Sequence, residues 1–109
     1  MDESFIVTVW NNGTFSKTGT GYGLKISIVD RDNYFRKTKK SAVLHLPGKT
    51  ETISVNTDKS SFWSTICREL ISKDIGQWLI TNNLGRWPRG SPPKLTMISL
   101  GNDEFRLKK

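Results

Sequence analysis

The residues that could support nucleophilic catalysis are one cysteine and one histidine, Cys67 and His45. A catalytic nucleophile needs a base within hydrogen-bonding reach, and that base is most often a histidine. Cys67 falls among apolar residues at helical spacing, where a thiol behaves as a small hydrophobic group. One cysteine and one histidine also provide too few ligands for a usual zinc site. We therefore expect no catalytic site, no metal and no cofactor, and we predict that the protein is not an enzyme.

Two further patterns invite a chemical interpretation, an acidic pair and a glycine-rich stretch. Asp30 and Asp32 end a predicted strand, where acidic side chains most often make turn hydrogen bonds rather than bind Mg²⁺. Glycines alternate with other residues over 19–23, but a phosphate-binding loop should open a helix, and this stretch leads into a predicted strand. We interpret it as a turn or bulge, whose glycines would also let a phosphate approach the backbone closely.

The densest run of positive charge lies over residues 31–40, which contain five cations, one acidic residue and two aromatic residues. If the run is a loop, its cations can neutralise phosphates and an exposed ring can stack on a base. The alternative is a solvated loop whose Phe35 anchors in the core. The candidate nucleic-acid contacts here are Arg31, Tyr34, Arg36, Lys37, Lys39 and Lys40.

A second basic cluster, Arg86-Trp87-Pro88-Arg89, lies in a proline-containing loop. Arginine binds phosphate through two parallel hydrogen bonds and stacks on aromatic rings. Trp87 either faces a ligand or folds back to cover the sheet. Lys25 points away from the apolar side of its predicted strand, so Lys25, with Lys17, would extend a basic surface across that face. We therefore add Arg86, Trp87, Arg89 and Lys25 to the predicted nucleic-acid-binding residues.

Strands are the main elements that must position these residues. Alternating or β-branched apolar residues bounded by turn residues predict strands. The predicted strands cover residues 5–10, 14–18, 24–30, 41–46, 51–55, 95–100 and 104–107. Turns rich in asparagine, proline and glycine at 11–13, 47–48 and 101–103 predict three hairpins.

One helical segment is predicted near residues 60–83. Its apolar residues recur at three- and four-residue spacings, which is typical of one buried helix face. The segment is either one bent helix or two helices, and we favour a break near residue 73, with Ser60 or Asp58 capping the first part and Ser72 the second. Gly85 is a plausible stop. Trp63 and Trp78 fall on the apolar stripe, so both are expected in the core.

The chain has 109 residues, which suits a single globular domain over 1–109. The order of strands, helical segment and strands predicts an α+β fold. We expect a curled antiparallel sheet or a partly open β-barrel of about six to seven short strands, with the broken helical segment packed on it. That architecture serves many nucleic-acid binders and many unrelated functions, so function must be argued from the site.

Seventeen Lys and Arg against ten Asp and Glu give a net charge of +7, which favours encounters with anionic partners or serves solubility. A single cysteine argues against a disulfide framework. The acidic N-terminus and the absence of an apolar run of 18 residues predict no targeting segment and no membrane span, and so a small basic cytoplasmic protein.

The leading hypothesis is a non-enzymatic nucleic-acid-binding module that grips phosphate through the 31–40 segment and the 86–89 loop. The alternative is a protein–protein interaction or accessory module, in which aromatic loops dock a partner and the charge steers the encounter. A third hypothesis is that the protein has a cleft that binds a small anion. The first hypothesis requires Lys37, Lys40, Arg86 and Arg89 to share a face. DNA versus RNA, specificity and oligomeric state are left open by the sequence.

Overall fold

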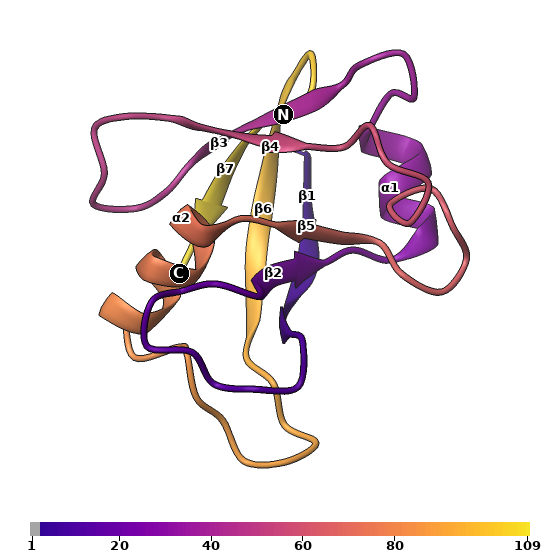
Figure 1. The fold of residues 1–109 in the computed structure, drawn as a ribbon. Helices are drawn as coiled ribbons and strands as arrows, with labels where there is room; N and C mark the ends of the chain where they lie inside the picture. The colour runs from indigo at the N-terminus through magenta and orange to yellow at the C-terminus, as the bar shows by residue number, and fades with distance from the viewer. Residues whose placement is uncertain (1–2) are drawn as a thin grey trace.

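A computed structural model describes residues 3–109 and shows seven strands and two short helices around one core (Figure 1). The elements follow the order β1 (Glu3–Asn11), β2 (Tyr22–Lys25), α1 (Ile28–Tyr34), β3 (Ser41–His45), β4 (Ile53–Asn56), β5 (Glu69–Ile71), α2 (Lys73–Thr81), β6 (Lys94–Gly101) and β7 (Glu104–Lys108). None of the helices in this described part is long and apolar enough to span a membrane.

The strands form one sheet in the order β4-β3-β7-β6-β1-β2-β5. Neighbouring strands are antiparallel except for β3 and β7, which are parallel. The sheet curls, so that β2 and β5 pass in front of β1 and β6 in Figure 1, and β5 returns to contact β4. The predicted α+β fold with a partly open barrel is therefore confirmed, with one parallel pair where the prediction had only antiparallel ones.

Alternation decides which side of β1 is buried. Phe5, Val7 and Val9 point into the core, whereas Ile6 between them is 53% exposed. The hairpins β3–β4 and β6–β7 also form where they are predicted. Asn102 and Asp103 take positive φ angles of 53° and 57° in the β6–β7 turn, the conformation that a tight hairpin turn requires.

The prediction of a strand over residues 14–18 is wrong, because these residues belong to a loop. Strand β2 begins only at Tyr22 and pairs with β1, so residues 12–21 connect the two strands. Hydroxyl groups in the loop bond to one another, with Ser16 Oγ 3.0 Å from Thr18 Oγ1 and Thr18 Oγ1 3.1 Å from Thr20 Oγ1. Such local side-chain bonds favour turns over regular strands.

The predicted strand over 24–30 ends early, and the predicted loop over 31–40 begins as a helix. Ser27 caps α1, because its hydroxyl accepts a hydrogen bond from the backbone N–H of Asp30 at 3.1 Å. A serine followed three residues later by an acidic residue is a helix-start signal. Arg31 and Tyr34 therefore lie in α1, and the loop proper covers residues 36–40.

The first half of the predicted helical segment is also wrong. Residues 60–68 form turns, and Leu70 belongs to β5, paired with Leu24 of β2. The hydroxyl of Ser64 accepts hydrogen bonds from the backbone N–H groups of Ile66 and Cys67, which competes with helix formation. The second half is confirmed as α2, capped by Ser72, although it ends at Thr81 rather than near Gly85.

Candidate nucleic-acid interface

The two basic segments lie at opposite ends of β1. At one end, the Phe5 ring stacks on Tyr34 with the ring centroids 4.7 Å apart. At the other end, the backbone N–H of Val9 donates to the carbonyl of Pro93, at the end of the 82–93 loop. Strand β6 gives their separation, because it begins at Lys94, directly after loop 82–93, and ends at Gly101, next to the Asp103 that bonds to Arg36, so that it spans about 23 Å. The structure therefore does not bring the 36–40 segment and the 86–89 loop onto one surface.

Arg31 is part of the interior rather than of a basic surface. Its side chain is 6% exposed and donates to the carbonyls of Phe62 and Ser64 at 3.0 and 2.6 Å. The guanidinium also lies 5.3 Å from the Trp63 ring and pairs with Asp32 at 3.1 Å. Arg31 holds the 60–68 segment against α1 and is not available to an external phosphate.

The remaining cations of the first cluster are exposed but have acidic neighbours. Arg36, Lys37, Lys39 and Lys40 are exposed, whereas Tyr34 is half-buried. The carboxylate of Asp103 accepts a hydrogen bond from the backbone N–H of Arg36 at 3.1 Å.

A hollow of about 460 Å³ beside this segment is lined by both Lys37 and Asp58. Lys59 lines the same hollow, and burial lowers the pKa of its ammonium group, although Glu69 and Cys67 oppose that change. The field at this end of the molecule is therefore mixed in sign.

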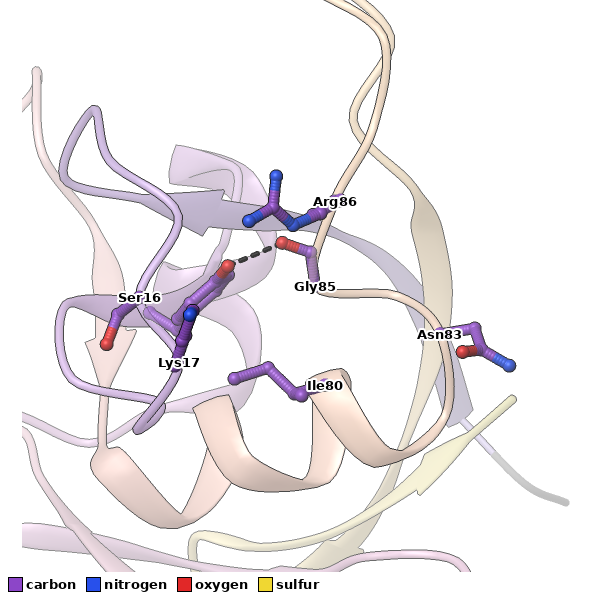
Figure 2. A pocket seen from close by; sticks show the side chains of 7 residues that line it. Ser16, Lys17, Ile80, Asn83, Gly85 and Arg86 are labelled. Carbon is purple, nitrogen blue, oxygen red and sulfur yellow. Dashed lines mark hydrogen bonds between the residues drawn. The ribbon is translucent and has the colours of Figure 1, made fainter.

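The second cluster forms part of a cavity between two loops. A pocket of about 300 Å³ lies between loop 12–21 and loop 82–93. Its lining residues are Ser16, Lys17, Tyr22, Ile80, Asn83, Gly85 and Arg86. Figure 2 shows Lys17 and Arg86 reaching toward the same space from the two loops, with Ile80 of α2 below them and Asn83 turned away to one side. We call the surface formed by residues 15–17 and 83–89 the two-loop surface.

A buried hydrogen bond from β2 and edge-to-face aromatic packing hold the two loops in place. The hydroxyl of Tyr22 donates to the carbonyl of Gly85 at 2.5 Å, the dashed line in Figure 2. Trp87 packs edge-to-face with both Tyr22 and Phe15, at centroid distances of 6.3 and 5.3 Å. The Arg86 guanidinium lies 5.2 Å from the Phe15 ring centre. Arg86 therefore has a fixed anchor, and Trp87 serves the packing of the loops.

Loop 12–21 is seated on α2 by a contact between two glycines. A Cβ atom at Gly76 would lie 2.0 Å from the carbonyl oxygen of Gly19, and a Cβ at Gly19 would lie 2.6 Å from the backbone nitrogen of Gln77. Only glycine allows backbones to approach this closely. The glycine-rich stretch is therefore a packing turn, and its position places Lys17 beside Arg86.

The two loops that form the two-loop surface contain no acidic residue. The sequence has no Asp or Glu over residues 4–29 or over residues 75–102, and these stretches contain both loops. Lys17, Arg86 and Arg89 are all exposed. The acidic residue that comes just before the second stretch, Asp74, lines a different hollow with residues 48–54. Three cations therefore face solvent here without a carboxylate from either loop.

The other candidate residues have local partners. Cys67 is half-buried in the segment before β5, and His45 on β3 bonds to the carboxylate of Glu104. Asp30 accepts a hydrogen bond from the hydroxyl of Ser27. Over residues 3–109, no group of three or more His, Cys, Asp or Glu side chains is placed to hold a metal ion.

No family model matches the chain, and no curated protein or solved structure is significantly similar to it. Function must therefore be inferred from the geometry of the site. The sequence predicts Arg86, Trp87 and Arg89 as contact residues, but it does not single out Phe15 and Tyr22, whose rings pack against Trp87. It suggests Lys17 only as an extension of the sheet surface. The two stretches without acidic residues are the signal that could have linked Lys17 to Arg86.

Proposed function

We propose that the protein is a non-enzymatic nucleic-acid-binding domain that holds phosphate groups at the two-loop surface. One observation carries the proposal. Lys17 and Arg86 come from loops far apart in the sequence, yet they line one cavity with no carboxylate from either loop. Converging cations on a fixed scaffold suit phosphate, and a guanidinium can contact two phosphate oxygens at once.

The proposal predicts a strong salt dependence. Each phosphate that a cation neutralises releases a condensed counterion, so affinity falls as salt rises. If Lys17, Arg86 and Arg89 each contact one phosphate, the logarithm of the association constant falls with that of the salt concentration with a slope of about −2 to −3. Binding that is independent of salt would contradict phosphate contact.

The test compares two charge-reversal pairs by fluorescence anisotropy with labelled single-stranded and double-stranded DNA of equal length. K17E/R86E alters the two-loop surface, and K37E/K39E alters the 36–40 segment by the same total charge. We expect K17E/R86E to weaken binding by more than about tenfold, which is about 1.4 kcal/mol, and K37E/K39E by less than about threefold. Equal losses for the two pairs, or no binding by the wild type at low salt, would overturn the proposal.

Protein docking is a second candidate function, favoured by two exposed aliphatic side chains. Val29 of α1 is 67% exposed and Ile66 is 77% exposed. The two segments are neighbours, because Arg31 of α1 bonds to the carbonyl of Ser64. If these residues dock a protein, V29S/I66S should remove that association and leave DNA affinity unchanged. Sedimentation velocity measures the first effect for self-association, and anisotropy measures the second.

A further inference from the structure

Trp10 differs from the other three tryptophans in its surroundings. The indole N–H groups of Trp63 and Trp78 donate to backbone carbonyls at 2.9 and 2.7 Å, and Trp87 packs against two aromatic rings. Trp78 lies in the core, and Trp63 and Trp87 pack against it. Within residues 3–109, Trp10 has no aromatic partner and is not among the side chains that pack against the core. The half-buried ring of Trp10 therefore has no role in the packing of the core.

Strand alternation places Trp10 on the outer face of the sheet, which is the side opposite the core. Its neighbour Val9 is buried, so Trp10 points outward. Trp10 pairs with Gly23 of β2, which has no side chain to stand opposite the ring. Strand β6, the other neighbour of β1, begins at Lys94 and does not reach the level of Trp10. The ring therefore lies at the end of the sheet with no strand side chain directly beside it.

Two lysines lie on the same outer face, one on each side of β1. Lys25 of β2 and Lys94 of β6 both pair with Thr8, which is two residues from Trp10. Residues that are diagonal to each other on neighbouring strands are about 7–8 Å apart, within reach of long side chains. Lys94 is exposed and Lys25 is half-buried. A ligand on the Trp10 ring would therefore have a lysine within reach on either side.

The carboxylates of the outer face lie nearer to Lys25 than to Lys94. Glu69 of β5 pairs directly with Lys25, although its side chain is buried. Glu104 of β7 lies at the far end of β6, about 23 Å along that strand from Lys94. Lys94 is therefore the cation of this face that is best placed to contact a phosphate, whereas the charge of Lys25 is offset by Glu69.

Both loops of the two-loop surface join the sheet beside Trp10. Loop 12–21 begins just after β1, and loop 82–93 ends just before β6. The backbone N–H of Val9 donates to the carbonyl of Pro93 at 2.9 Å, which ties the end of the second loop to β1. Figure 1 shows β1 entering the first loop and β6 leaving the second at the same end of the sheet. A chain of nucleotides held by the cations of the two loops can therefore continue onto Trp10.

This combination of an available ring and nearby cations suits an unpaired base. Proteins that bind single strands stack bases on aromatic side chains while cations contact the backbone phosphates, whereas a duplex hides the faces of its bases. Resting on the proposed function, we propose that Trp10 is a base-stacking residue and that the ligand of the two-loop surface is single-stranded nucleic acid, with one base on the Trp10 ring and a phosphate at Lys94.

The test uses a base-free DNA strand, which keeps the phosphates and sugars of the normal strand. The wild type should bind a normal strand of about 12 nucleotides at least about fivefold more tightly than the base-free strand, because stacking on one ring changes affinity by about fivefold to 150-fold. Trp10→Leu should bind both strands equally, and Trp10→Phe should keep part of the preference. Fluorescence anisotropy measures these affinities. Ile6→Ala, at an exposed position on the outer face of the same strand, is the control and should keep the full preference.

A second measurement tests the phosphate contact at Lys94. Lys94→Gln removes one cation and should make the salt slope for single-strand binding shallower by about 0.7. Lys37→Gln makes the same change in the 36–40 segment and should leave the slope unchanged. Thermal unfolding shows whether each variant is folded, and the comparison of normal and base-free strands on the wild type decides the stacking step even if Trp10→Leu does not fold.

Three outcomes would overturn the inference. They are tighter binding of duplex than of single strand by the wild type, equal affinity of the wild type for the normal and base-free strands, and an unchanged preference for the normal strand in Trp10→Leu. The proposed function fails separately, when K17E/R86E leaves the affinity for the base-free strand unchanged. A loss in K17E/R86E with none in Trp10→Leu would keep the two-loop phosphate site and reject stacking on Trp10.

Discussion

The 36–40 segment and the two-loop surface are both basic, but they differ in whether acidic side chains lie beside the cations. The first concentrates four exposed cations in five residues, but Asp103 and Asp58 lie beside it. The second gathers fewer cations from two distant loops, with no carboxylate from either. Charge density along the chain is thus a poor guide to a site, because the field at a surface depends on which segments converge there.

The two regions also differ in what holds them. Loop 12–21 is fixed to α2 by the Gly19–Gly76 contact and to loop 82–93 by the packing of Phe15 against Trp87. A surface whose groups are fixed before binding loses less conformational freedom when the ligand arrives. The comparison can be tested at three residues, each with a control at a neighbouring or equivalent position.

The largest expected effect is on stability, from Arg31→Ala. The substitution removes the guanidinium group that donates hydrogen bonds to the carbonyls of Phe62 and Ser64. Hydrogen bonds to a charged group contribute about 1.5–3 kcal/mol each, so we expect a loss of about 3 kcal/mol in the free energy of unfolding. Urea denaturation measures it. Arg36→Ala, at an exposed neighbour, should cost less than about 0.5 kcal/mol. Similar small effects for both would place Arg31 with the surface cations after all.

A smaller loss of stability is expected from Gly76→Ala, which disturbs the contact that holds loop 12–21 against α2. The added Cβ would lie 2.0 Å from the Gly19 carbonyl oxygen, so the loop must move. Overpacking of this kind costs about 1–3 kcal/mol, and displacement of Lys17 should also weaken DNA binding. Unfolding and anisotropy measure the two effects. Thr81→Ala, exposed on the same helix, is the control. An unchanged DNA affinity in Gly76→Ala would show that the loop position does not matter for binding.

The parts of the fold that the sequence predicts correctly depend on local patterns. Alternation gives β1, and the Asn102–Asp103 turn gives the last hairpin, because both signals lie within a few residues. The helical spacing from Phe62 to Leu70 misleads, since Phe62 enters the core from a turn and Leu70 from a strand. Both residues are buried, so they fit the apolar spacing of a helix although neither lies in one. Only the pairing of Leu70 with Leu24 shows that this residue belongs to a strand.

The candidate site, like the fold, is predictable where it depends on residues close in the sequence and not where it depends on long-range contacts. Arg86 and Trp87 are adjacent in the sequence, so their cluster is visible without a structure. The position of Lys17 beside Arg86 depends on a contact between Gly19 and Gly76 and on one hydrogen bond from Tyr22. These interactions join residues far apart in the chain, and no local pattern encodes them. The burial of Arg31 is hidden for the same reason, because its partners lie in the 60–68 segment.

The smallest expected effect comes from Tyr22→Phe, matched by Tyr34→Phe at the other end of β1. Tyr22→Phe removes the hydroxyl that donates to Gly85 and keeps the buried ring against Trp87. Loss of one neutral hydrogen bond costs about 1 kcal/mol of stability. Because the bond ties loop 82–93 to β2, its loss should let Arg86 move and weaken DNA binding by a few-fold.

Tyr34 contributes its ring to the stack on Phe5, and phenylalanine keeps that ring. Tyr34→Phe should therefore change neither the free energy of unfolding nor DNA affinity beyond about 0.5 kcal/mol. The two substitutions together show whether the Tyr22 hydroxyl contributes to stability alone or to DNA binding as well. If Tyr22→Phe lowers stability but leaves affinity unchanged, Arg86 reaches phosphate without the clamp, and the convergence of charge alone accounts for binding. If both fall together, the hydrogen bond that ties loop 82–93 to β2 is part of what makes this end of the barrel a binding site.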